Sequence, residues 1–171
     1  MIQSILKTKR INWTLTGRMA CLFSIAAVFG TTSMAVDLSA VQWITPNPPV
    51  RQELTSCVHV VEFWATWCSP CKAQIPHMQS LAKKYEDRNV IFIGLCEDRS
   101  AGKVSAFVEK KKITYHIGLG NGLSDSLGIT SIPFALVISH KGEILWSGNP
   151  RDRQFEETLK LAVNAAPKPM L

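Results

Sequence analysis

The chain has 171 residues and a mass of 19.0 kDa, 46% hydrophobic and 19% charged, which is enough for one domain of ordinary size. This composition excludes a disordered or collagen-like chain. The formal charge of +6 includes four basic residues before position 35, where no acid occurs; the remainder carries 15 basic and 13 acidic residues. So small a surplus, with no basic run longer than residues 110–112, excludes nucleic-acid binding as the leading function.

Residues 1–35 have the order of a secretory signal peptide: a basic stretch, an apolar core at residues 19–30, and small residues ending in Ser33-Met34-Ala35. The 12-residue core is shorter than the roughly 20 residues that span a bilayer. We therefore expect cleavage before Val36 and export to the periplasm or another compartment outside the cytoplasm. The alternatives are retention of residues 19–35 as a membrane anchor, and an organelle transit peptide.

Four cysteines remain after this segment: Cys57, Cys68, Cys71 and Cys96. An exported protein meets conditions in which disulfides persist. About 136 residues are enough to bury a core without covalent cross-links, so a close cysteine pair is available for a chemical purpose.

The first half of the chain alternates predicted strands and helices. Residues 36–56 are a Pro-rich lead-in, irregular or an edge strand, and residues 57–165 form the domain. The apolar runs at residues 58–64 and 90–96 are typical of strands buried on both faces. Apolar residues three and four apart predict helices over residues 72–86, with a kink at Pro76, and 103–112. This alternation predicts an α/β fold with parallel strands joined by right-handed crossovers.

The second half predicts an antiparallel pair and a closing helix. Residues 118–122 form a glycine-rich loop that lacks the strand before it and the long helix after it that a phosphate loop requires. A short turn at residues 123–127 precedes strands at residues 134–139 and 143–147. Asn149-Pro150 then predicts the cap and first turn of a helix with one apolar stripe, and residues 166–171 form a flexible tail. The residues of that stripe are Phe155, Leu159, Ala162 and Val163.

A Cys-x-x-C motif, Trp67-Cys68-Ser69-Pro70-Cys71, stands where a buried strand ends and a helix begins. At a helix start, unpaired backbone N–H groups and the positive end of the macrodipole stabilise a thiolate. We therefore predict that Cys68 is the exposed nucleophile. Cys71, almost one helical turn later, is the predicted resolving thiol that attacks the mixed disulfide and releases the partner.

The segments FWATWCSPCK, Ile132-Pro133 and Lys-Gly-Glu at residues 141–143 resemble the thioredoxin superfamily, specifically its exported TlpA-like (redoxin) branch of thiol-disulfide interchange proteins. The similarity runs from about Trp43 to the last helix. It implies a thioredoxin-like fold, a central mixed β-sheet flanked by helices, with Pro133 in cis beside the sulfurs and the backbone of Ile132 pairing with a substrate peptide. The residues expected to contact the substrate are Trp67, Pro70, Ile132 and Pro133.

Three positions bear on how closely this chain follows the family. Gln74 replaces a glutamate that many exported members carry near the sulfurs. Glu62 stands where thioredoxin has a buried aspartate, and burial would raise its pKa so that it takes or returns the proton of Cys71; the alternative is a glutamate on a partly wet strand face. Phe134 replaces the small residue, Thr or His common after the cis proline, which would reshape the substrate groove.

The sequence therefore predicts an exported thiol-disulfide oxidoreductase that reduces protein disulfides, because Ser-Pro between the cysteines resembles the Gly-Pro of reducing members. The resemblance implies protein disulfide substrates such as apocytochrome c and a membrane-borne thiol electron donor. We expect no cofactor and a monomer. The alternatives are a disulfide-forming oxidase, a thiol peroxidase of the same fold, in which Thr66 would precede the reactive cysteine, and a non-catalytic binding or metal-carrying module.

The other cysteines and one histidine are weaker candidates. Cys96 ends its strand on the same side as Cys68, so it is either a third exchanging thiol or a small buried residue. Cys57 begins its strand at the opposite edge, so a Cys57–Cys96 disulfide is not expected. His77 lies on the helix of the two motif cysteines, but a fourth metal ligand has no evident source, so we expect no metal.

Other polar and aromatic residues are assigned structural positions. His59 and His116 have no predicted role. Trp43 and Trp146 are predicted to pack at either end of the sheet, with lining of a partner groove as the alternative. The basic residues 110–112 are predicted to form a solvated helix end that complements the dipole.

Overall fold

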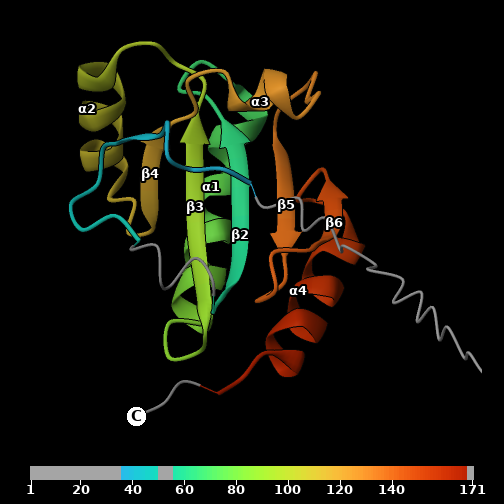
Figure 1. Ribbon diagram of the computed structural model, residues 1–171. Helices are drawn as coiled ribbons and strands as arrows, with labels where there is room; N and C mark the ends of the chain where they lie inside the picture. Colours follow the sequence, from blue (N-terminus) through green and yellow to red (C-terminus); the bar gives the residue numbers. More distant parts are fainter. Residues whose placement is uncertain (1–35, 50–55, 169–171) are drawn as a thin grey trace, which may run out of the picture. The chain divides into compact units, whose positions relative to one another are not determined.

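The structure is a computed structural model that describes residues 36–49 and 56–168. The predicted signal peptide lies outside these residues, as does its alternative, an anchor at residues 19–35. Within the described ranges, no helix combines the length and the apolar character needed to cross a membrane. The elements in chain order are β1 (Gln42–Trp43), β2 (Val58–Trp64), α1 (Ser69–Lys84), β3 (Val90–Cys96), α2 (Ala101–Lys111), β4 (His116–Leu119), α3 (Leu123–Ser126), β5 (Phe134–Ile138), β6 (Ile144–Gly148) and α4 (Arg153–Ala165) (Figure 1).

One six-stranded sheet forms the centre of the fold, in the order β1-β4-β3-β2-β5-β6. The strands β2, β3 and β4 run parallel, whereas β1, β5 and β6 are each antiparallel to their neighbour. Val58 pairs with Val90 and Trp64 with Cys96, so the two central strands start and end together. The predicted mixed sheet of a thioredoxin-like α/β fold is confirmed.

The two faces of the sheet are covered by different parts of the chain. Apolar residues of α1, α2 and α4 join one face in a single buried cluster that contains both motif cysteines. The other face packs against α3 and residues 36–43. In Figure 1, α1 passes behind β2 and β3, and residues 36–49, in blue, cross in front of them. The strand β2 is buried along its whole length because both of its faces are covered.

The predicted elements match the observed ones closely in the two central strands and less closely at helix starts. The helix α1 begins at Ser69 and ends at Lys84, three and two residues before the predicted limits. The helix α2 spans residues 101–111 instead of 103–112, β5 ends one residue earlier than predicted, and β6 begins and ends one residue later. The stripe predicted for α4 is confirmed, because Phe155, Leu159, Ala162 and Val163 are all buried.

The predicted cap of the last helix is wrong. The helix α4 begins at Arg153 after an N-cap at Asp152, not at Pro150. Asn149 instead organises a turn ahead of the helix: its Oδ1 accepts the Arg151 N–H at 3.1 Å, and its carbonyl accepts the Asp152 N–H at 2.9 Å. An Asn-Pro pair suits such a turn as well as a helix start, so the sequence alone does not separate the two.

The glycine-rich segment was also partly mispredicted. Gly118 and Leu119 belong to β4, which pairs with β3 on one side and β1 on the other. A Cβ on Gly118 would lie 2.3 Å from Val41 Cγ1, so glycine is needed there for close packing of the lead-in. The loop itself starts at Gly120.

Candidate active site

The two motif cysteines form a disulfide at the first turn of α1. Their sulfurs are bonded, and their Cα atoms are 5.3 Å apart. Cys68 is the N-cap of the helix, and its Sγ accepts the backbone N–H of Cys71 at 3.2 Å. Pro70 lies in the first turn, where its missing N–H costs no helical hydrogen bond. The first turn contains no acidic residue, so no local carboxylate opposes the positive end of the helix dipole at the sulfurs.

Cys68 is less exposed than predicted. Its exposed fraction is 5% and that of Cys71 is 2%, so the predicted exposure of Cys68 is wrong for the disulfide form, although Cys68 is the more accessible of the two. The residues beside it provide the open surface: Trp67 is 64% exposed, and Ser69 and Pro70 are also exposed. The N-cap position explains the burial, because the Cys68 side chain turns back onto its own helix.

The predicted cis peptide bond between Ile132 and Pro133 is confirmed. β5 begins directly afterwards at Phe134, which pairs with Phe63 near the end of β2. Since β2 and β5 are antiparallel, the start of β5 lies beside the strand end from which the motif loop departs. The register thus brings Ile132 and Pro133 to the same end of the sheet as the motif.

Glu62 is fully enclosed in the sheet. Its exposed fraction is 3%, so the alternative of a partly wet strand face is wrong. The hydroxyl of Tyr115 donates a hydrogen bond of 2.5 Å to Glu62 Oε1. Burial raises the pKa of Glu62 from 4.5 to about 7, against the lowering effect of that hydrogen bond. The predicted direction is confirmed, and the carboxyl group is poised to gain or lose a proton near neutral pH.

Gln74 and Phe134, the other two departures from the family pattern, both contact neighbouring parts of the fold. Gln74 is buried in α1, and its Nε2 donates to the carbonyl oxygen of Pro150 at 3.4 Å. Arg151 Nη2 donates in turn to the carbonyl oxygen of Pro70 at 3.4 Å. The turn before α4 is thereby fastened to the first turns of α1. Phe134 packs against the cluster that covers the other sheet face.

Asp98 is a site residue that the sequence analysis missed. Its carboxylate accepts the Thr66 N–H at 2.7 Å and the Thr66 hydroxyl at 2.8 Å. Lys103 Nζ lies 2.7 Å from Asp98 Oδ1, and the Cys96 thiol donates to Oδ2 at 3.3 Å. Burial alone would raise the pKa of Asp98, but the hydrogen bonds from Lys103 and Thr66 outweigh it and hold the pKa at about 2. Asp98 therefore anchors the loop that leads to Cys68 onto the end of β3.

Cys96 is completely buried, and burial is the largest cause that raises its pKa to about 12. A thiol with so high a pKa is a poor nucleophile near neutral pH, which favours the reading of Cys96 as a small buried residue. Cys57 lies at the far end of β2, and its sulfur is not bonded to that of Cys96, as predicted.

The remaining candidates occupy structural positions. His77 Nε2 lies 3.4 Å from Glu156 on α4. In the described ranges, no three His, Cys, Asp or Glu side chains gather in a way that would hold a metal ion. Trp43 and Trp146 pack at opposite ends of the sheet as predicted, against the rings of His116 and Phe155. The basic residues 110–112 are exposed at the end of α2.

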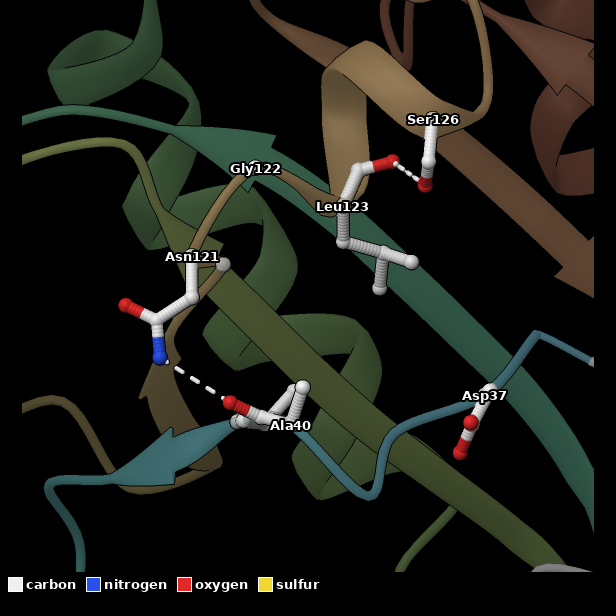
Figure 2. Close-up of a pocket in the computed structure, with 8 residues that line it drawn as sticks. Asp37, Ala40, Asn121, Gly122, Leu123 and Ser126 are labelled. Atoms are coloured by element: carbon white, nitrogen blue, oxygen red, sulfur yellow. Dashed lines mark hydrogen bonds between the residues drawn. The ribbon is translucent and has the colours of Figure 1, made fainter.

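Two of the pockets near α3 are lined by Asn121 and Gly122. One of about 300 Å³ is formed between the segment before β1 and the loop that leads into α3, where Asn121 Nδ2 donates to the carbonyl oxygen of Ala40 at 2.9 Å (Figure 2). The other, of about 470 Å³, is lined by Cys96, Glu97, Asp98, Arg99, Asn121, Gly122 and Asp125. Neither is lined by Cys68 or Cys71, so the disulfide does not open into them.

Together, the mixed sheet, the Cys-x-x-Cys disulfide at a helix start and the cis proline define a protein of the thioredoxin superfamily. The family model Redoxin matches residues 47–162. The chain therefore belongs to the Redoxin family, and the resemblance to the TlpA-like branch is confirmed.

The chain is similar to a thiol-disulfide oxidoreductase and to a thioredoxin-like protein. It is 30% identical over 105 residues to ResA of Halalkalibacterium halodurans, covering 59% of this chain and 60% of that protein. It is 29% identical over 107 residues to the thioredoxin-like protein YneN of Bacillus subtilis, covering 60% and 63%. The chain thus spans about three fifths of the length of these relatives.

Solved structures show the same fold. A thiol:disulfide interchange protein of the thioredoxin family from Chlorobium tepidum TLS has a TM-score of 0.62 and 25% identity, covering 71% of this chain and 90% of that one. A thiol-disulfide isomerase from Corynebacterium glutamicum has a TM-score of 0.70 at 16% identity, covering 79% and 99%. The second similarity concerns the fold alone.

Proposed function

We propose that this chain is a thiol-disulfide oxidoreductase that reduces disulfides of protein substrates through Cys68 and Cys71. The observation that carries the proposal is the disulfide between these residues at the N-terminus of α1. The names of the similar proteins ResA and YneN, and membership of the Redoxin family, support the same chemistry.

In the proposed reaction, the reduced pair gives two electrons to the substrate. The Cys68 thiolate, stabilised by the helix N-terminus, attacks one sulfur of the substrate disulfide, and the other substrate sulfur leaves as a thiolate that takes a proton from water. Cys71 then loses its proton to Glu62 and attacks Cys68. The Cys68–Cys71 bond forms, the bond to the substrate breaks, and the second substrate thiolate leaves and is protonated.

The substrate surface in this proposal surrounds the buried sulfurs. Trp67 is a large exposed apolar side chain directly before Cys68, and Pro70 is exposed directly after it. Ile132 and Pro133 lie at the same end of the sheet. An extended substrate segment would pair with the Ile132 backbone and place its disulfide against Cys68.

The direction and location belong to the same proposal. Ser-Pro between the cysteines resembles the reducing members of the family, and the order of residues 1–35 supports export. We therefore propose that the protein acts outside the cytoplasm, receives electrons from a membrane-borne thiol donor, and includes apocytochrome c among its substrates. Electrons enter and leave through sulfur, so the proposed reaction requires no cofactor.

A redox titration with thiol trapping and mass spectrometry tests the proposal. The expected result is a reversible Cys68–Cys71 couple near the potential of thioredoxin, about −270 mV. A much more oxidising couple would indicate a disulfide donor instead, and catalytic decay of added peroxide would indicate a peroxidase. The absence of a reversible couple, or a stoichiometric bound metal, would favour a binding module.

Substitution of each cysteine tests the assigned roles. Cys68→Ser should abolish insulin reduction, whereas Cys71→Ser should accumulate substrates as mixed disulfides on Cys68, visible on non-reducing gels. Cys57→Ala is the matched control, because Cys57 lies at the opposite end of β2, and it should keep the turnover of the unmodified protein. Recovery of no covalent adduct from Cys71→Ser would contradict the mechanism.

A further inference from the structure

Glu62 lies in a gap in the sheet that is built around its side chain. It pairs with Gly94 of β3 and Ala135 of β5, so both lateral neighbours are small. Along β2 it lies on the same face as Val60 and Trp64, which belong to the buried cluster that contains Cys68 and Cys71. The carboxyl group therefore projects toward the face that carries the disulfide.

Tyr115 enters this gap from the segment before β4. A Cβ on Gly94 would lie 3.1 Å from Tyr115 Cε2 and 2.7 Å from Ile117 Cδ1, closer than packed atoms normally approach. The absence of a side chain at Gly94 thus makes room for the Tyr115 ring, whose hydroxyl donates to Glu62 Oε1. Among the described residues, Tyr115 is the one hydrogen-bond partner of the Glu62 carboxyl group.

We propose that Tyr115 is a positioning residue for Glu62: its hydroxyl holds Oε1, so that Oε2 is the atom that receives the proton of Cys71. This inference rests on the proposed disulfide reduction. When Cys71 forms its bond to Cys68, the Cys71 proton moves to Oε2 and later to water. The substrate thiolate leaves with the electron pair of the broken bond.

Tyr115 also influences the pH range in which Glu62 can accept that proton. A hydroxyl that donates to a carboxylate favours the charged form, so Tyr115 lowers the Glu62 pKa while burial raises it. The other titratable side chains of the buried cluster on this face are Cys96 of β3, the Cys68–Cys71 pair of α1, and Tyr85 at the end of α1. In the oxidised protein the motif cysteines form a disulfide, burial raises the pKa of Cys96 to about 12, and no charged side chain contributes to the Glu62 pKa.

The first experiment reads Glu62 directly in the oxidised full-length chain, without any turnover. The carboxyl carbon of 13C-labelled glutamate is followed by NMR against pH, and Glu62→Gln assigns the signal. We expect a midpoint near 7 that rises by about 1 pH unit in Tyr115→Phe, because the donor to the carboxylate is lost. An unchanged midpoint in folded Tyr115→Phe would overturn the proposal.

The chain offers a matched control and a second perturbation, because it contains two tyrosines. Tyr85→Phe removes the hydroxyl of a buried tyrosine at the end of α1 and should leave the midpoint unchanged. In that background, incorporated fluorotyrosine is confined to Tyr115. A fluorinated phenol is a stronger donor, so the midpoint should fall, and this arm remains decisive if Tyr115→Phe does not fold.

The second experiment follows the proton step. A mixed disulfide of Cys68 with thionitrobenzoate is prepared by stopped flow, and release of the coloured thiol by Cys71 is measured between pH 5 and 9. Tyr115→Phe should shift the pH midpoint of release upward by the same amount as the NMR midpoint, and should shift nothing in a Glu62→Gln background. Equal release rates in all variants would overturn the proton transfer. If the proposed disulfide reduction is wrong, the redox titration will show no reversible Cys68–Cys71 couple. The NMR titration does not depend on that result, because it is made on the oxidised protein without turnover.

Discussion

The difference in unfolding free energy between Glu62→Gln and the unmodified protein should shift in favour of the variant as the pH rises. The pKa of Glu62 is 4.5 in the unfolded reference and about 7 in the fold, where burial raises it. Between these values the unfolded chain releases a proton that the folded chain retains. The contribution of Glu62 to stability is therefore highest below pH 4.5 and falls as the pH rises through 7, and glutamine removes this contribution's pH dependence.

The size of the effect follows from the two pKa values. A difference of about 2.5 units corresponds to about 3 kcal/mol of unfolding free energy at 1.36 kcal/mol per unit. No correction for solvent screening is needed because Glu62 is buried. The glutamine oxygen still accepts the Tyr115 hydroxyl, and its buried N–H group adds a cost that is the same at every pH. The expected signature is thus a stability difference that changes by about 3 kcal/mol between pH 4 and pH 8.

Urea unfolding of the oxidised protein at several pH values measures this difference. Other groups titrate in both proteins and cancel, provided that the slope against urea is the same. Glu109→Gln, at an exposed position of α2, is the control and should show no pH-dependent difference. Two stability curves separated by a constant amount from pH 4 to pH 8 would refute the reasoning.

Three further outcomes are expected in unfolding experiments. Asp98→Asn should cost about 2 kcal/mol at pH 7, because the pKa of Asp98 is held at about 2 instead of 3.8, and the cost should vanish as the pH falls through 2; a constant cost down to pH 2 would contradict this. Thr66→Val should cost about 1 kcal/mol, since it removes one of the two hydrogen bonds that Thr66 donates to Asp98. Leu159→Ala should cost about 2–5 kcal/mol, whereas exposed Leu161→Ala should stay within about 0.5 kcal/mol.

The centre of the fold was predictable from the sequence because local pattern and tertiary environment agree there. The runs at residues 58–64 and 90–96 are mostly apolar, and the structure buries the first throughout and the second from Phe92 onward. The stripe of α4 is equally regular. The disulfide follows from the spacing of Cys68 and Cys71 and from their place after a strand. In each case a few consecutive residues contain all the information required.

The parts that were missed depend on residues distant in sequence. Tyr115 reaches Glu62 across 53 positions, and Asp98 reaches Thr66 across 32, so no local pattern announces either contact. β4 was overlooked because Gly118 resembles a loop residue, whereas its small size serves the packing of Val41. One signal could have indicated Asp98: it closely follows the second buried strand. Parallel strands end at the same edge of a sheet, so this carboxylate would be expected near the motif loop that follows the first buried strand.

Both edge strands of the sheet are poorly suited to pair with a strand of another molecule, for different reasons. At one margin lies β1, only two residues long, which offers few backbone groups to another extended chain. At the other lies β6, five residues long, whose pairing with β5 is interrupted by a register shift between Val137 and Ile138. A short strand and an irregular one are both poor templates for further strand addition. The fold therefore limits its own growth into larger sheets, even though Ile144 and Leu145 are exposed along β6.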